Sequence, residues 1–320
     1  MTYYAFALAS AVLSTTSFFA NLVGLNLSSS IRSMAGIYII IPLILIPQIL
    51  LSGTIISFDK LPPVLAHKKY TSFVGDLMAS RWAYEGLVVN NFLNNDYESL
   101  FYWIDKKESE LFFKANYLIP SLQEITDKDI SEIAPDWQLV LNNLIKLNEE
   151  TDPTEAKKQI LGLDLNERNI LWIREKLKEK RHFYNSLIKQ IIYLKDQKIA
   201  EESREHGGNL ALLALKEKNH NSRLGEILIN RDTKDKIIRH KNEFIKKHEP
   251  IYTVPTSRFG RAHFYAPVKK LGNFFIQTYW FNIFVIWTMN LFLFLLLYYE
   301  VLNKIINISY SKRVKKNDSD

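Results

Sequence analysis

Residues 274–299 read FFIQTYWFNIFVIWTMNLFLFLLLYY, and no charged side chain occurs between Asn273 and Tyr299. A run of about 20 apolar residues is long enough to cross the hydrocarbon core of a bilayer as a helix. Aromatic residues lie near both ends of the run, as is typical of the two membrane–water interfaces. The stretch therefore predicts a membrane-spanning helix that is slightly too long and is expected to tilt.

Two more apolar stretches precede it, at about Tyr3–Gly24 and Ala35–Ser57, and Arg32 is the only charged residue before the end of the second stretch. No Lys or Arg precedes the first stretch, which is also longer than the apolar part of a typical signal peptide. We therefore interpret it as a span. It carries small residues at four-residue spacing, such as Ala5 and Ala9, which let helices approach closely in lipid.

The second stretch carries two prolines and an amide, followed by two small residues: Pro42, Pro47, Gln48, Ser52 and Gly53. Each proline removes a backbone donor and clashes with the preceding turn. In lipid, the freed carbonyls need partners from neighbouring helices or water. Two interpretations stay open. The residues form either a static kink that aids packing or part of the wall and gate of a translocation path.

The distribution of charge predicts the orientation. The tail after Glu300 is basic, and the turn between the first two spans holds Arg32. Three spans put these two segments on the same side, which the positive-inside rule makes cytoplasmic. Residues 58–272 are then extracytoplasmic, because long loops cross largely regardless of their charge. Attraction to anionic lipid explains the basic tail better than nucleic acid does.

An amphipathic helix is predicted over Ser72–Phe92, lying at or dipping into the outer membrane face. Arg81 and Glu85 are four residues apart and share one face of this helix. An exposed ion pair there would contribute little to stability. We favour the other interpretation, in which Arg81, Trp82 and Glu85 form a structural lock at the membrane interface.

Residues 98–250 are charged and have a helical pattern. One apolar stripe predicts a long helix from Asn166 to His206, which Gly207-Gly208 ends. Further helices are predicted at Ser99–Asn116, Asp136–Asn148, Pro153–Leu161 and Ser222–Lys247. We therefore expect a helical hairpin or a small bundle outside the membrane.

Motifs for catalysis are not found in the sequence: it has no GxxxxGK[ST], HExxH or GxSxG pattern. The 7 histidines are scattered without metal-ligand spacing. The absence of cysteine excludes disulfides, thiolate metal sites and a cysteine nucleophile. We expect no catalytic, cofactor-binding or metal-binding residues in this chain, so an intramembrane enzyme is the weakest of the function classes.

Several segments resemble the permease domain of ABC exporters of the G subfamily, the white or eye-pigment group, and its bacterial relatives. GLNLSSS at residues 24–30 and PLILIPQILLSG at residues 42–53 resemble the fourth and fifth spans. SRWAYEGL at residues 80–87 resembles the membrane-dipping helix that follows, and the last span resembles the sixth. The resemblance covers about residues 1–97 and 251–310, and its motifs are common in the class without being unique to it.

This resemblance implies a permease segment that contributes the last spans and the outer gate to ATP-driven transport. Family members usually carry an ATPase domain and three further spans before these segments, so we expect the chain to be the C-terminal part of such a transporter. It would hydrolyse no ATP itself, and ATP and Mg would bind to the ATPase domain. Expected partners are that domain, the remaining transmembrane helices in a homo- or heterodimer, and membrane lipid, but no nucleic acid. The alternative is a non-transport membrane protein that displays an external helical sensor or scaffold.

The expected fold is an all-α, multi-pass protein of the cell membrane with three transmembrane helices, a membrane-dipping helix and a large extracytoplasmic helical insert. It has five parts: two transmembrane helices with a short cytoplasmic turn (1–57), interfacial or re-entrant helices (58–97), the helical insert (98–250), a return segment with the last transmembrane helix (251–300), and a basic cytoplasmic tail (301–320).

Overall fold

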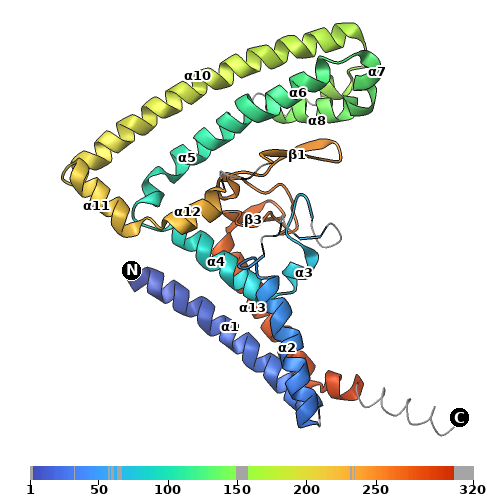
Figure 1. Cartoon of the computed structure of the whole chain (residues 1–320), viewed down its shortest axis with the longest axis vertical. Helices are drawn as coiled ribbons and strands as arrows, with labels where there is room; N and C mark the ends of the chain where they lie inside the picture. Colours follow the sequence, from blue (N-terminus) through green and yellow to red (C-terminus); the bar gives the residue numbers. More distant parts are fainter. Residues whose placement is uncertain are drawn as a thin grey trace, which may run out of the picture. The chain divides into compact units, whose positions relative to one another are not determined.

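The computed structural model describes residues 3–31, 33–56, 58, 61–62, 67–148, 158–230, 233 and 235–305. The chain is mostly helical, as predicted (Figure 1). It divides into two compact units: unit 1 is Met1–Asn91 with Pro255–Asp320, and unit 2 is Phe92–Val254. Arg32 and the basic tail from residue 306 onward, on which the predicted orientation depends, lie outside the described residues.

Two helices of unit 1 are long and apolar enough to cross a membrane, α1 (Tyr3–Ser30) and α13 (Thr278–Tyr298). A third apolar helix, α2 (Met34–Leu50), has only 17 residues, or about 25 Å at 1.5 Å per residue. It ends well before Ser57, because the chain turns at Gly53, which has a φ of +84°. The structure thus supports two spans by length and composition, and the third stays a prediction.

α1 packs along α13 through apolar side chains and interhelical hydrogen bonds. The Tyr279 hydroxyl donates to the Leu8 carbonyl at 2.8 Å. The Asn26 amide donates to the Leu293 carbonyl at 3.0 Å, and the Asn290 amide donates to a carbonyl of α1 at 3.2 Å. Such bonds contribute about 0.6 kcal/mol each in membrane proteins, so these polar side chains help to hold two otherwise apolar helices in one register.

The predicted helix Ser72–Phe92 is two helices, α3 (Phe73–Asp76) and α4 (Ala79–Leu93). The start of the predicted last span is also different, because residues 274–277 form a strand. Strands β3 (Val268–Leu271) and β4 (Phe274–Gln277) pair as an antiparallel hairpin directly before α13. A two-residue connection containing Gly272 joins them. Gly272 has a φ of +60°, which suits a tight hairpin turn.

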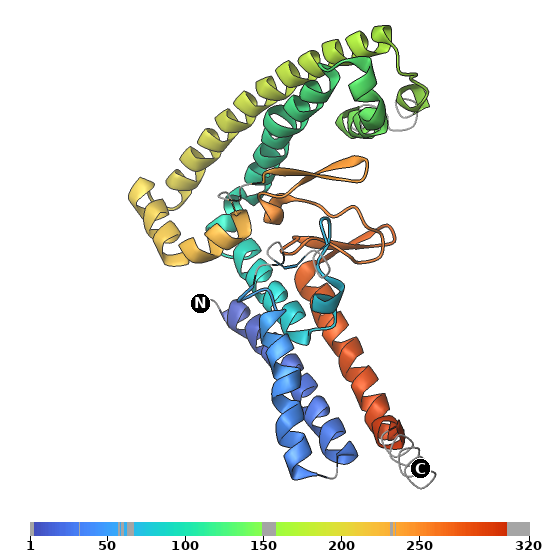
Figure 2. The same ribbon diagram turned by 45° about the vertical axis from the view of Figure 1, so that its right-hand side comes forward.

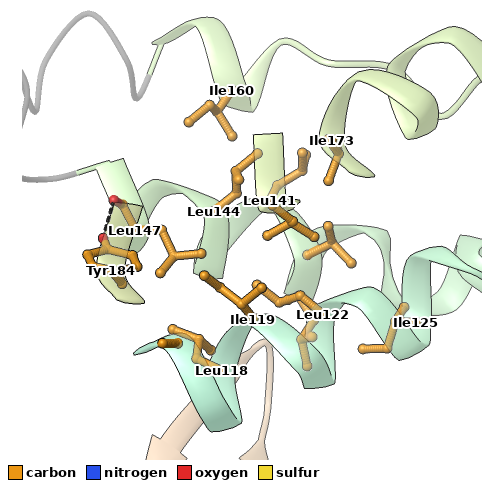
Figure 3. Close-up of a cluster of buried hydrophobic side chains, with 14 of the residues drawn as sticks. Leu118, Ile119, Leu122, Ile125, Leu141, Leu144, Leu147, Ile160, Ile173 and Tyr184 are labelled. Carbon is orange, nitrogen blue, oxygen red and sulfur yellow. Dashed lines mark hydrogen bonds between the residues drawn. The ribbon is translucent and has the colours of Figure 1, made fainter. Parts of the chain in front are cut away.

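Unit 2 is built around α10 (Glu167–Glu205), which confirms the long helix predicted from the apolar stripe. It packs against α5 (Glu98–Phe113), η2 (Lys114–Leu118) and α6 (Ile119–Thr126). Figure 3 shows part of the buried core that these helices share, which includes Leu118, Ile119, Leu122, Leu144, Leu147, Ile173 and Tyr184. The Tyr184 hydroxyl is not left unpaired in this core, because it donates to the Leu147 carbonyl at 3.0 Å.

The remaining elements of unit 2 are short: α7 (Ile130–Ile133), η3 (Ala134–Asp136), α8 (Trp137–Asn148), α11 (Asn209–Asn219), α12 (Ser222–Ile229), β1 (Ile237–His240), β2 (Glu243–Lys246) and η4 (Pro250–Tyr252). The predicted helix Ser222–Lys247 is therefore wrong beyond Ile229. Asn230 ends α12 in the left-handed conformation, with a φ of +45°, and β1 and β2 form a hairpin after it. Most of the predicted helix Pro153–Leu161 lies outside the described residues.

Candidate functional site

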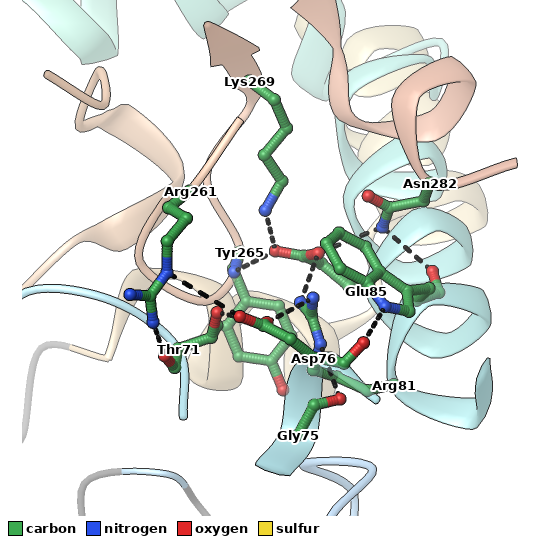
Figure 4. A network of polar contacts seen from close by, with 10 residues as sticks. Thr71, Gly75, Asp76, Arg81, Glu85, Arg261, Tyr265, Lys269 and Asn282 are labelled. Carbon is green, nitrogen blue, oxygen red and sulfur yellow. Dashed lines mark hydrogen bonds and ion pairs between the residues drawn. The ribbon is translucent and has the colours of Figure 1, made fainter. Parts of the chain in front are cut away.

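A cluster of charged side chains is buried at the start of α4 (Figure 4). Arg81 and Glu85 are both 0% exposed, and an Arg81 Nη donates to Glu85 Oε2 at 3.1 Å. The other Nη lies 2.8 Å from an Asp76 oxygen, and Arg81 Nε donates to the Gly75 carbonyl at 3.2 Å. This burial excludes an exposed surface pair. It is compatible with the predicted lock, whose position at a membrane stays a prediction.

Glu85 has three further donors that the sequence did not suggest. Lys269 Nζ lies 2.7 Å from Glu85 Oε1, and the backbone N–H of Tyr265 donates to the same oxygen at 3.2 Å. The Asn282 amide donates to Glu85 Oε2 at 3.0 Å and to the Trp82 carbonyl at 2.9 Å. A single carboxylate therefore ties α4 to the return segment, to β3 and to α13.

Trp82 completes the predicted set of three residues. Its ring lies 3.5 Å from the Arg81 guanidinium, a cation–π contact, and its indole N–H donates to the Asp76 carbonyl at 2.8 Å. The break between α3 and α4 makes this possible, because it turns Asp76 back toward the first turn of α4. The structure thus brings Arg81, Trp82 and Glu85 together around the end of α3.

The charges in this cluster compensate one another. Burial alone would raise the pKa of Glu85, but the Lys269 ammonium and the Arg81 guanidinium hold it below its ordinary value. Burial lowers the pKa of Lys269, and the Glu85 carboxylate offsets part of that effect. The two buried cations, Arg81 and Lys269, thus face the carboxylates of Glu85 and Asp76. The partly exposed Arg261 is a third cation, 3.8 Å from Asp76. Buried charges are tolerated when they are paired in this way.

The second feature of unit 1 is a half-open apolar cavity of about 600 Å³ between α1, α2 and α4. Small residues of α1, such as Ala20 and Gly24, line one wall, and aliphatic residues of α2 line another. Of the five residues predicted to line a path, Gln48 and Ser52 reach this cavity. It therefore has apolar walls with a few polar side chains.

Gln48 links α2 to the first turn of α4. Its side-chain carbonyl accepts from the Ser80 backbone N–H at 3.3 Å and lies 3.0 Å from the Ser80 hydroxyl. The same hydroxyl lies 2.5 Å from the Gln48 backbone carbonyl, and its single hydrogen can serve only one acceptor at a time. Ser52 stays local, because its hydroxyl donates to the Ile49 carbonyl at 2.7 Å.

The other three predicted path residues are not among the residues that line the cavity. A Cβ on Gly53 would lie 2.5 Å from the Phe264 ring and 2.9 Å from the Phe58 ring, so this glycine serves the turn and its packing. Pro47 and Pro42 lie within α2, none of whose residues is buried. Nothing in their surroundings distinguishes a gate from a static bend, and a role in a path stays a prediction for them.

The cluster residues that sequence reasoning missed are Asp76, Arg261, Tyr265, Lys269 and Asn282. Asn282 had a signal, because an amide within a charge-free span requires an internal partner. Lys269 had none, since its contact with Glu85 joins residues 184 positions apart. Within the described residues, no group of three or more His, Asp and Glu side chains is placed to hold a metal ion.

Fold and site together define a mostly helical chain with two helices suited to a membrane, an apolar cavity and a buried charge cluster. Comparisons with protein-family models, curated proteins and solved structures found no match to the chain. The resemblance to exporter permeases therefore rests on its sequence motifs alone.

Proposed function

We propose that this chain is a permease segment of an ATP-binding-cassette exporter, in which α1, α2 and α13 are three transmembrane helices. The observation that carries the proposal is the cavity between α1, α2 and α4, with Gln48 and Ser80 at its polar part. An exporter needs a space within its helices that a substrate can enter, and this space is bounded by the segments that resemble the fifth span and the membrane-dipping helix.

The arrangement suits movement of α2 past a fixed neighbour. The cluster around Glu85 holds α4 to α13, whereas α2 has no buried residue and meets α4 through Gln48. ATP binding to the ATPase domain would switch a paired bundle between inward and outward access. In that cycle α2 changes its position at the cavity, while α4 keeps the outer part of the segment in place.

Purification of the tagged chain from its native membrane, in mild detergent, tests the proposal. We expect an ATPase-bearing polypeptide to be present in stoichiometric amount and the complex to hydrolyse ATP. A tagged membrane protein of similar size and span number, purified in parallel, controls for adventitious capture. A chain that purifies without any ATPase would contradict the proposal and favour a membrane protein that displays unit 2 as an external scaffold or sensor.

A further inference from the structure

The β3–β4 hairpin exposes large apolar side chains at its tip. Phe259 and Phe274 are 87% and 78% exposed, and Leu271 is exposed as well. Leu271 pairs with Phe274 across the hairpin and with Phe259 through an isolated bridge on its other side. Directly opposed residues share one face of a sheet. The side chains of Phe259, Leu271 and Phe274 are therefore neighbours on one face, and we call them the apolar row.

The hairpin is fixed at the start of α13, from which it extends sideways (Figure 2). The backbone N–H of Gly260 donates to the Lys270 carbonyl, and that of Gly272 donates to the Arg258 carbonyl, both at 2.8 Å. Gly260 has a φ of +71°, and a Cβ there would collide with the Phe281 ring of α13. The apolar row therefore has a defined position relative to the N-terminal end of α13.

The segment that carries the apolar row is basic, although two of its cations, Lys269 and Arg261, contact the carboxylates of Glu85 and Asp76. No acidic residue occurs between Glu249 and Glu300, whereas this segment holds four basic residues. Lys270 lies on the hairpin, with its ammonium 5.1 Å from the Phe275 ring centroid, and Arg258 is exposed beside the row. Aromatic side chains with basic neighbours are typical of the membrane–water interface, where the cations meet lipid phosphates.

The exposed apolar surface also continues along the chain into α13, where Trp280 and Phe284 are exposed. If α13 crosses the bilayer, as the proposed function requires, its first turns lie at the interface that the hairpin adjoins. A bilayer can cover both surfaces at once. This continuity favours lipid over a soluble protein as the partner of the apolar row.

We infer that the β3–β4 hairpin is a membrane-interface anchor. The apolar row enters the boundary between headgroups and acyl chains, and Arg258 and Lys270 contact lipid phosphates. The anchor sets the depth of the buried cluster as well, because Lys269, the neighbour of Lys270 in β3, is bonded to Glu85. The inference rests on α13 being a span, and the experiment tests the two separately.

The chain has no cysteine, so single cysteines can carry a spin label. We would label Asn273→Cys, which leaves the apolar row intact, in vesicles of phosphatidylcholine with phosphatidylglycerol. Leu291→Cys, at an exposed position of α13, is the lipid reference, and Ser131→Cys, on the surface of unit 2, is the water reference. Collision rates with oxygen and with a water-soluble nickel chelate measure the depth of each label.

The anchor predicts that the ratio of oxygen to nickel collisions at Asn273→Cys lies between the two references. Adding Phe259→Ser and Phe274→Ser should shift it at least twofold toward the water value. A water value at residue 273 with a lipid value at residue 291 overturns the anchor alone. Water values at both overturn the span, and with it the proposed function. Protection from both reagents, or spin–spin broadening between copies, overturns lipid in favour of a protein contact.

Discussion

The Glu85 carboxylate forms ion pairs with two cations, Arg81 and Lys269. The second cation changes the expected effect of exchanging Arg81 and Glu85. If Arg81 and Glu85 formed an isolated pair, exchanging the two residues would partly restore their interaction. However, Lys269 Nζ lies 2.7 Å from the Glu85 carboxylate. An arginine at position 85 would face this lysine at close range within a buried site. We therefore expect no rescue by the exchange, unlike the behaviour of an isolated pair.

The pair to test is Glu85 and Lys269. Glu85→Gln should lower the free energy of unfolding by about 3–5 kcal/mol, because it leaves the buried Lys269 ammonium without its carboxylate. Lys269→Met should cost less, because Glu85 keeps its ion pair with Arg81. The double variant should lose clearly less than the sum of the two. Chemical denaturation in detergent micelles measures all three. Lys176→Met, which removes a solvent-exposed ion pair with Glu179, is the control and should change little. Additive losses would show that the two side chains act independently.

His248 predicts a pH dependence for unit 2. Burial lowers the pKa of this imidazole, and the neighbouring Lys246 ammonium lowers it further, although Glu249 acts in the opposite sense. Below an ordinary pKa of about 6.5, the unfolded chain takes up a proton that the folded chain refuses. Stability should therefore fall as the pH drops from about 7 toward the lower pKa of the folded state.

Thermal unfolding of the full chain at several pH values between 5 and 7.5 measures this effect. His248→Gln keeps a polar side chain of similar reach but cannot titrate in this range. We expect the variant to show a smaller loss of Tm on acidification than the unaltered chain. If Tm falls equally with decreasing pH in both proteins, groups other than His248 cause the acid sensitivity.

Among the elements, α2 ends just before a turn that requires the positive φ of Gly53. Gly53 has a φ of +84°, and a Cβ there would collide with the rings of Phe264 and Phe58. Gly53→Ala should therefore destabilise the protein by about 1–3 kcal/mol. Gly24→Ala is the matched control, because a Cβ there meets nothing within 4 Å and lies in regular helix. If both variants unfold at the same denaturant concentration, the turn at Gly53 is not a constraint.

Variants at the contact between Gln48 of α2 and Ser80 of α4 distinguish a packing role from a transport role. Gln48→Leu and Ser80→Ala each remove side-chain hydrogen bonds between the two helices, so each should cost about 0.5–1.5 kcal/mol. Both residues line the cavity, so if a translocated substrate passes there, either substitution should alter the substrate-stimulated ATPase rate of the reconstituted complex. Equal, unchanged stimulation in both variants would make Gln48 a packing residue.

Periodicity predicted the helices α8 and α10 closely but did not predict the short strands. The stripe in α10 repeats over many turns, so its helix was predicted to within one residue at each end. Strands β1 and β2 have four residues each, too few for a period of two to stand out from a helical pattern. Their turn also depends on a positive φ at Lys241, which is unusual for this residue type.

In the candidate site, too, the local contacts could be predicted from the sequence and the long-range contacts could not. Arg81 and Glu85 were predicted to be neighbours because a four-residue spacing is a local property of helices. Their burial and the contact with Lys269 depend on how distant segments pack, which spacing does not determine. Gln48 was singled out because an amide in an apolar run needs a partner. The partner, Ser80, lies 32 positions away and follows from the fold alone.

For the whole molecule, the arrangement across the membrane remains a prediction with a direct test. We expect residues 98–250 outside the cell and the basic tail in the cytoplasm. In intact cells, a membrane-impermeant thiol reagent should label Ser131→Cys and leave Ser311→Cys unlabelled until the cells are permeabilised. The unaltered cysteine-free chain is the control. The opposite pattern would reverse the orientation.

The separation of Glu85 from Lys269 also sets an order of events during synthesis. Lys269 follows Glu85 by 184 residues, and ribosomes add about 5–20 residues per second. Lys269 is therefore added roughly 10–40 s after Glu85. All of unit 2, Phe92–Val254, is made within that interval. The inserted unit is thus synthesised in full before the ribosome adds Lys269, which completes the ion pair in unit 1.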